Sequence, residues 1–400
     1  MPYYRAVGEI PRKRHVQLRK PGGGLYAEEL MGEEGFSSDS SLLYHVHLPT
    51  AIVKSEGVAD AAADGVTHNL PLAPRHFRTQ DLPGGGDFVL GRQLLLANDN
   101  VRICFVAADR PSELYRNSAG DDLVYLHSGR ARLESVYGLI DAGPGDYVLV
   151  PTGTAHRWVP LSPAEGEPGH VQALVVEARG HVRTPRRYLS PSGQFLEHAP
   201  YCERDLRGPQ GPLLAEGKDV PVLVRNRAGL TRLTYANHPF DVVGWDGYLY
   251  PYAFNIADFE PVVKRTHAPP PVHQTFEGPG FVVCSFCPRP LDFDPAAVPI
   301  PYNHHNVDSD EVMFYVAGDY SARRGSGIGI GSVSLHPSGF THGPQPGAVE
   351  AAVRGLAEGK RSTDETAVMI DTFRPLMLGS AARRVEDPGY AWSWADGRSS

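Results

Sequence analysis

Short apolar runs, each closed by Gly, Pro, Asn or Asp, form the main hydrophobic pattern of this chain. This spacing predicts short β-strands joined by tight turns, as in a sandwich or barrel. One set of runs covers residues 88–159 and a second covers residues 248–345. Helices are expected at only two places, Ala348–Glu358, where Ala, Val and Leu line one side, and Tyr26–Met31. The pattern therefore predicts a mainly β protein with two strand-rich regions.

The two strand-rich regions share a motif. The pattern Gly-x5-Pro-x-Gly-x2-His occurs at Gly145–His156 and again at Gly331–His342. An acidic pair followed by an apolar run precedes each copy, Asp121-Asp122 in the first and Asp310-Glu311 in the second. Two linked motifs in the same order indicate that one structural unit is present twice.

This pair of motifs resembles the signature of the cupin family. The resemblance implies an all-β (mainly) bicupin fold, with two jelly-roll β-barrels, short helices and long connecting segments. The expected organisation follows the chain in four parts. These are an N-terminal segment at 1–85, a cupin without metal at 86–200, a metal-binding cupin at 201–345, and a C-terminal segment at 346–400.

In the second copy, the cupin ligand positions are occupied by His305, Glu311 and His342. Two imidazoles and one carboxylate suit Fe(II) and leave one face of its octahedron open. His305 and Glu311 are an even number of positions apart, so on an extended strand both point to one face. The adjacent His304 is expected to point the other way.

The first copy serves as an internal control. Aligning Asp122 with Glu311 places Arg116 where His305 stands, and a guanidinium cannot coordinate a metal. The first barrel is therefore expected to lack a metal site. Its remaining Asp122 and His156 are expected to form a hydrogen-bonded pair.

Composition excludes several classes of partner. The net charge of −8 and the dispersed Lys and Arg residues offer no cationic surface for nucleic acid. No apolar run approaches the length needed to cross a membrane, and the first residues lack the apolar core of a signal peptide. The four cysteines are too dispersed for a disulfide framework. A cytoplasmic protein is expected.

Several further segments are similar to homogentisate 1,2-dioxygenases, notably Pro239–Trp245, the region from His305 to Glu311, Gly318–Tyr320 and Ser334–Pro344. The resemblance implies an Fe(II)-dependent ring-cleaving dioxygenase that opens homogentisate to maleylacetoacetate in tyrosine and phenylalanine catabolism. Its partners would be a small aromatic acid and O2, and its assembly a trimer-based homo-oligomer.

The same resemblance implies a role for individual residues. Iron would be held by His305, Glu311 and His342, and His273 would be the acid/base residue. Tyr320, His336 and His342 would contact the substrate. One departure concerns the Asn-His-His run before Glu311, which replaces the usual aromatic residues of the family and bears on the substrate.

Three alternatives stay open at this point. A related enzyme acting on gentisate or another hydroquinone or hydroxybenzoate would use similar ligands. A metal-binding cupin without catalytic turnover belongs to a different class of protein, and a zinc-dependent isomerase is a third possibility. The metal itself is not identified by the ligand types alone.

Overall fold

The structure is a computed structural model that describes residues 3–59, 65–162 and 170–395. Strands predominate, and the α-helices among the described residues are α1 (Ala348–Ala357) and α2 (Ser380–Arg384). This confirms the mainly β fold and the helix expected near residue 348. No described helix has the length and apolarity needed to span a bilayer.

The chain forms two compact units. Unit 1 contains residues 1–63, 84–93 and 104–255, and unit 2 contains residues 64–83, 94–103 and 256–400. The expected boundary at residue 201 therefore differs from the structure. Residues 201–255 pack within unit 1, because their strands pair with strands of the first barrel. The segment after residue 346 likewise contributes a strand to the second barrel.

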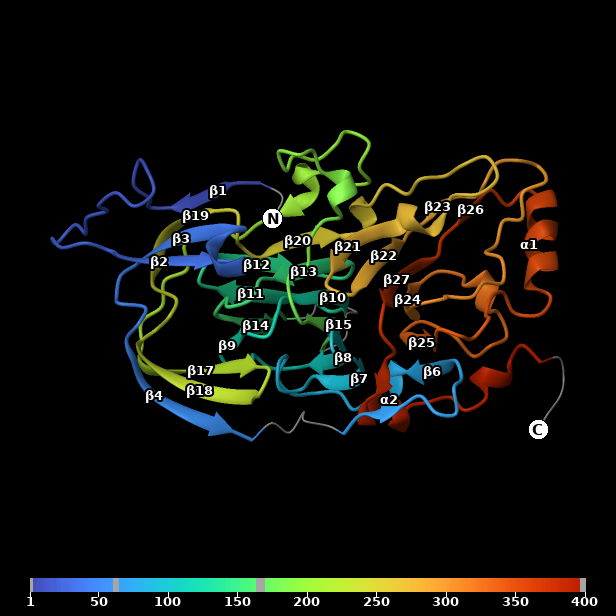
Figure 1. Ribbon diagram of the computed structural model, residues 1–400, viewed down its shortest axis with the longest axis horizontal. Coiled ribbons are helices and arrows are strands. Elements are labelled where there is room, and N and C mark those ends of the chain that lie inside the picture. Colours follow the sequence, from blue (N-terminus) through green and yellow to red (C-terminus); the bar gives the residue numbers. More distant parts are fainter. Residues whose placement is uncertain (1–2, 60–64, 163–169, 396–400) are drawn as a thin grey trace. The chain divides into compact units, whose positions relative to one another are not determined.

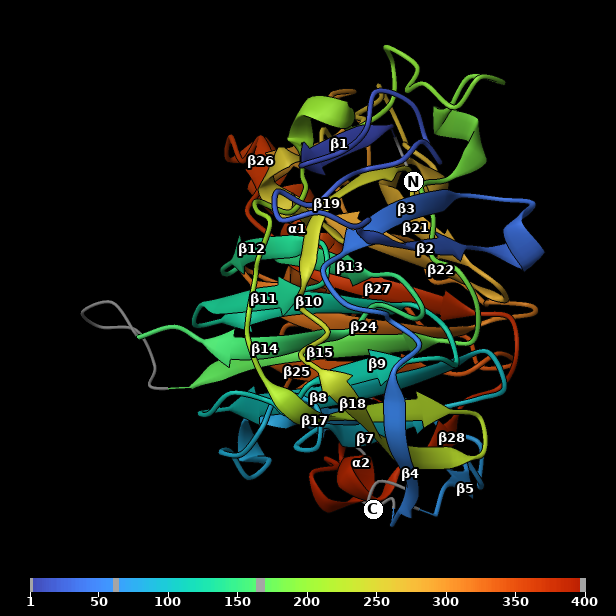
Figure 2. The ribbon, with the colours of Figure 1, turned by 90° about the vertical axis from the view of Figure 1, so that its left-hand side faces the viewer.

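Unit 1 is built from mainly antiparallel sheets, and Figure 2 shows β11, β12 and β14 running next to one another. A four-stranded sheet has the order β1 (Arg5–Gly8), β19 (Val242–Gly247), β3 (Ser40–His45) and β2 (Ala27–Gly32). A seven-stranded sheet has the order β12 (Gly138–Ala142), β11 (Ala131–Ser135), β14 (His156–Pro160), β9 (Tyr115–Asn117), β17 (Lys218–Asn226), β18 (Gly229–Asn237) and β4 (Ile52–Val58). The remaining strands pair in the order β16 (Leu206–Arg207), β20 (Tyr252–Asn255), β13 (Asp146–Val150), β10 (Asp122–Ser128), β15 (Val171–Ala178) and β8 (Val101–Ala108).

Unit 2 is organised around one six-stranded sheet, in which β24, β25 and β27 lie side by side (Figure 1). Its order is β21 (Gln274–Gly278), β22 (Phe281–Phe286), β27 (Thr366–Thr372), β24 (Asp310–Ala317), β25 (Ser332–His336) and β6 (Arg75–Arg78). Shorter strands of this unit are β5 (Thr67–His68), β7 (Gln93–Ala97), β23 (Arg289–Pro290), β26 (Ser362–Thr363) and β28 (Met377–Leu378).

The helix expected at Tyr26–Met31 is wrong, because this segment forms strand β2. It pairs with β3 along its whole length, from Ala27 opposite His45 to Gly32 opposite Ser40. Tertiary pairing has overridden the weak local preference for helix. A short segment with few apolar residues gives no reliable periodicity from which to distinguish the two.

Strand register shows that the repeated motif is structurally equivalent in the two units. In unit 1, Asp122 on β10 lies opposite Val150 on β13 and Glu177 on β15. In unit 2, Glu311 on β24 lies opposite His336 on β25 and Asp371 on β27. The Pro-x-Gly corner is also repeated, with φ of 82° at Gly153 and 83° at Gly339, a conformation that favours glycine.

A buried guanidinium neutralises two carboxylates that face each other on neighbouring strands of unit 1, Asp122 and Glu177. Nη1 of Arg92 donates to Oδ2 of Asp122 at 2.9 Å and to Oε1 of Glu177 at 2.8 Å. Asn117 donates to the second oxygen of Asp122 at 2.6 Å. The expected Asp122–His156 pair is therefore wrong, because Arg92 and Asn117 take up the carboxylate, and Nδ1 of His156 donates to the carbonyl of Thr154.

We predict that Arg92→Met destabilises the protein by about 3–5 kcal/mol, because Asp122 and Glu177 lose the cation that compensates their burial. Chemical denaturation followed by circular dichroism measures this effect. Arg132→Met is the matched control, since Arg132 pairs with Asp141 at an exposed site and its loss costs about 1 kcal/mol or less. Equal shifts of the two unfolding midpoints would contradict the importance of the buried pair.

Candidate metal centre

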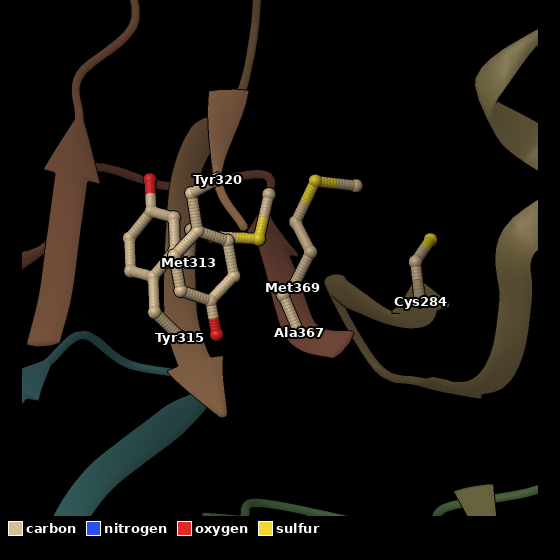
Figure 3. Close-up of a cluster of buried hydrophobic side chains, with 6 residues drawn as sticks. All are labelled: Cys284, Met313, Tyr315, Tyr320, Ala367 and Met369. Atoms are coloured by element: carbon tan, nitrogen blue, oxygen red, sulfur yellow. The ribbon is translucent and has the colours of Figure 1, made fainter. Parts of the chain in front are cut away.

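Strand β24 presents one row of side chains to the interior of the second barrel. Because side chains alternate along a strand, Glu311, Met313 and Tyr315 share one face. Their partners on β27 are Asp371, Met369 and Ala367. Figure 3 shows the apolar members of this row, where Met313, Met369, Tyr315 and Ala367 gather with Cys284 and Tyr320. Glu311 therefore continues a face that is otherwise apolar.

Two imidazoles converge on the Glu311 carboxylate. Nε2 of His304 lies 3.5 Å from Oε2 of Glu311, and Nε2 of His342 lies 3.5 Å from Oε1. The ligand atoms of these three residues all lie within 4.8 Å of one another, so one ion could contact all three. The group combines two nitrogen donors with one carboxylate oxygen.

Backbone contacts fix both imidazoles in place. The amide of His304 donates to the carbonyl of His342 at 2.8 Å, and the amide of His342 donates to that of His304 at 2.9 Å. Nδ1 of each ring then contacts the carbonyl two residues earlier, Tyr302 for His304 at 3.1 Å and Phe340 for His342 at 3.2 Å. A carbonyl can only accept, so Nδ1 donates to it, and Nε2, which faces Glu311, is the nitrogen of each ring that could bind a metal.

The first imidazole of the group is His304, whereas the sequence analysis placed His305 there. His305 is exposed, and its Nδ1 lies 3.5 Å from the hydroxyl of Thr341. The alternation argument assumed an extended strand from His305 to Glu311, but β24 begins only at Asp310. The preceding loop therefore sets which imidazole turns inward.

The electrostatic surroundings favour an ionised Glu311. Burial opposes its charge, but the three facing imidazoles of His304, His336 and His342 together hold its pKa well below the usual range. At the neighbouring Asp371, burial and the charge of Glu311 both disfavour ionisation, and together they raise the pKa of the carboxyl group to about 8.

The residues of this centre fit a divalent metal ion. Nε2 of His342 is buried and has no hydrogen-bond partner among the described residues, as expected of an atom aimed at a ligand. Arg92 neutralises Asp122 and Glu177 in unit 1, whereas within the described ranges the ion pairs of Glu311 involve only imidazoles. Imidazole nitrogen with carboxylate oxygen suits Fe(II) and also other divalent metals.

His336 holds the carboxylate from the other side. Its Nδ1 lies 2.8 Å from Oε1 of Glu311, and its Nε2 lies 2.8 Å from the hydroxyl of Tyr390. Since Glu311 is ionised, Nδ1 donates to it and Nε2 accepts from Tyr390. Both nitrogens of this fully buried ring are thus used within the protein, an arrangement that orients Glu311. Contact between His336 and a substrate stays a prediction.

The two other predicted site residues lie along the same barrel. The His273 ring packs on Phe286 with 4.6 Å between centroids, and its buried Nδ1 has no hydrogen-bond partner among the described residues. The Tyr320 hydroxyl donates to the carbonyl of Thr366 at 3.0 Å. No hydrogen bond within the described ranges joins the His273 ring to Glu311, His304 or His342, so its proposed role depends on a bound substrate.

A second group of metal-binding residue types, in unit 1, is explained by the fold. Glu33, Asp121 and His181 lie close enough to share an ion. Asp121, however, accepts hydrogen bonds from the backbone amides of Thr152 and Val182, and Glu33 pairs with Arg183. These contacts connect loops of unit 1. Both carboxylates therefore have protein partners and do not require a metal.

Sequence reasoning missed Asp371 and Tyr390. A usable signal existed for Asp371, because an apolar run ending in an acidic residue occurs in both copies, at Val171–Glu177 and Ala367–Asp371. Tyr390 lies in the C-terminal segment expected at 346–400. Nothing in its local pattern indicates a contact with His336, because that contact joins residues far apart in the chain.

Comparisons with known proteins agree on one family. Residues 265–398 match the family described as homogentisate 1,2-dioxygenase C-terminal. The chain is 37% identical to "Putative dioxygenase SSO1533" of Saccharolobus solfataricus, over 98% of this chain and 99% of that protein. It is 26% identical to a homogentisate 1,2-dioxygenase of Bradyrhizobium diazoefficiens, over 93% of this chain and 86% of that protein.

The solved structures give a weaker likeness. Bacillus subtilis oxalate decarboxylase is 12% identical, covers 76% of this chain and 77% of its own, and gives a TM-score of 0.33. A likeness at this level supports no statement about activity.

We predict that His304→Ala weakens metal binding by more than about 100-fold, because changes even outside the ligand set cost 10–100-fold. His305→Ala is the matched control and should retain the metal, since the ring is exposed and outside the group. Competition with a chelator, followed by elemental analysis, measures both variants. Loss of metal from His305→Ala alone would restore the ligand set expected from the sequence.

Proposed function

The chain belongs to the homogentisate 1,2-dioxygenase family, and on that premise we propose that it is an Fe(II)-dependent dioxygenase that opens homogentisate to maleylacetoacetate. The observation that supports this proposal is the convergence of the His304 and His342 Nε2 atoms on the Glu311 carboxylate. Two imidazoles and one carboxylate on one side of an ion leave positions open for a substrate and O2. The reaction incorporates both atoms of O2 into the ring-opened product.

A bound Fe(II) ion would supply the electronic chemistry that allows an electron-rich ring to react with O2. The protein's own part is to hold and orient the ring. Met313 and Met369 lie on the face that carries Glu311, two register positions from the Glu311–Asp371 pair, and offer an apolar surface to a planar substrate. Their side chains would also exclude water from the reacting ring.

His273 is proposed as the base that takes a phenol proton. Burial, together with the charge of Arg289, lowers its pKa to about 3, so the imidazole is neutral at pH 7. A general base works best with a pKa near the operating pH, so a bound substrate would have to raise this pKa for the ring to take the proton. Its Nδ1 has no hydrogen-bond partner among the described residues. Tyr320 is proposed to bind a polar group of the substrate, since its hydroxyl lies near the same interior face.

We predict that the protein reconstituted with Fe(II) consumes O2 with homogentisate faster than with gentisate or hydroquinone. An oxygen electrode measures uptake, and ultraviolet absorbance follows the ring-opened product. Protein treated with a chelator is the control and should be inactive. Faster uptake with gentisate or hydroquinone would make that compound the assigned substrate in place of homogentisate. No uptake with any of the three would favour a metal-binding cupin without turnover.

We predict that His273→Asn lowers kcat by about 100-fold or more and leaves the metal content unchanged, as expected for loss of a general base. His68→Asn provides the matched control, because His68 is exposed and lies in the same unit. Steady-state kinetics and elemental analysis are made on both variants. An unchanged kcat in His273→Asn would remove this residue from the mechanism.

A further inference from the structure

Asp371 is a polar residue of the metal centre with no role in the reaction described so far. Its position on β27 is directly opposite Glu311 on β24. Alternation along β27 places it on the same face as Ala367 and Met369, which contribute to the interior apolar cluster. Its carboxyl group interacts electrostatically with both Glu311 and His304. The side chain therefore lies beside two members of the metal centre.

The Asp371 carboxyl group needs a hydrogen-bond donor that the described protein does not provide. Its Oδ1 is buried and has no hydrogen-bond partner among the described residues. A buried polar atom left in this state is unfavourable, so such atoms normally have a partner when the site is in use. Asp371 as a whole is only partly buried, so a ligand that enters the centre can reach it.

In the first barrel, the carboxylate at the equivalent position has a hydrogen-bond donor within the protein. Glu177 occupies the equivalent register position, opposite Asp122, and its Oε1 accepts from the Arg92 guanidinium at 2.8 Å. In the part of unit 2 that the structure describes, no Lys or Arg forms an ion pair with Asp371. The donor must therefore come from water or from a bound molecule.

Asp371 is also distinct from the metal ligands. The group whose ligand atoms lie within 4.8 Å of one another contains His304, Glu311 and His342 and does not contain Asp371. A carboxyl group just outside a ligand set is placed to contact a molecule that binds the metal. Either protonation state of the group leaves one oxygen able to accept a hydrogen bond.

We propose that Asp371 accepts a hydrogen bond from a phenolic hydroxyl group of the substrate and so selects rings that carry a free hydroxyl next to the metal. This inference rests on the proposed function, since it assigns the group that recognises the substrate of that same site. Water occupies the position before the substrate binds. The residue binds the substrate and is separate from His273, which takes the proton.

The test compares two ligands on the protein loaded with Fe(II) under anaerobic conditions, where binding occurs without turnover. Isothermal titration calorimetry measures the affinity for homogentisate and for its methyl ether, in which the hydroxyl next to the side chain is blocked. Asp371→Ala is expected to weaken homogentisate binding by roughly 10- to 100-fold, because the substrate hydroxyl is then buried without a hydrogen-bond partner. Binding of the ether should not change.

Two further variants complete the experiment. Asp371→Leu fills the space without an acceptor oxygen and should behave as Asp371→Ala does, so one variant suffices if the other fails to fold. Asp308→Ala is the matched control, because Asp308 is exposed and lies in the loop before β24. It should leave both affinities unchanged.

Three results would overturn the inference while leaving the proposed function intact, provided that the wild-type protein opens homogentisate. They are unchanged affinity for homogentisate in both Asp371 variants, an equal loss for the two ligands, and loss of the metal, which would make Asp371 a ligand. Failure of the wild-type protein to bind any hydroxyl-bearing ring would instead reject the proposed function, and the inference with it.

Discussion

A pair of carboxyl groups on neighbouring strands is the constraint on which both barrels depend. Two acidic groups buried together are unfavourable unless a positive charge or several hydrogen-bond donors accompany them. Unit 1 meets this requirement with the Arg92 guanidinium between Asp122 and Glu177. Unit 2 surrounds Glu311 with three imidazoles, which can donate protons or bind a metal. The same position is therefore structural in one unit and suited to chemistry in the other.

The repeat made the fold and half of the centre predictable from the sequence. Glycine corners and acidic pairs recur at matched positions, so the strands followed from spacing, and the resemblance to cupins indicated Glu311 and His342 as ligands. His304 was missed because the loop before β24 is irregular, and side-chain direction in a loop does not follow alternation. Asp371 and Tyr390 were missed because their contacts connect distant parts of the chain.

The domain boundaries were hard to place for a related reason. Residues 201–255 follow the first motif and precede the second, and their apolar pattern suits either barrel. Pairing decides the matter, since β20 pairs with β13 and β17 pairs with β9. Local pattern predicts that a strand exists, but the strand it pairs with depends on the whole fold.

The hydrogen bond from Tyr390 to His336 has a consequence for the order in which the protein is made. His304, Glu311, His336 and His342 leave the ribosome before Tyr390, and β27 must also emerge before it can pair with β24. During synthesis, the ligand carboxylate therefore exists for a time without the contact that orients its neighbouring imidazole. A metal captured at that stage would meet a looser site, which is less able to discriminate between ions than the completed one.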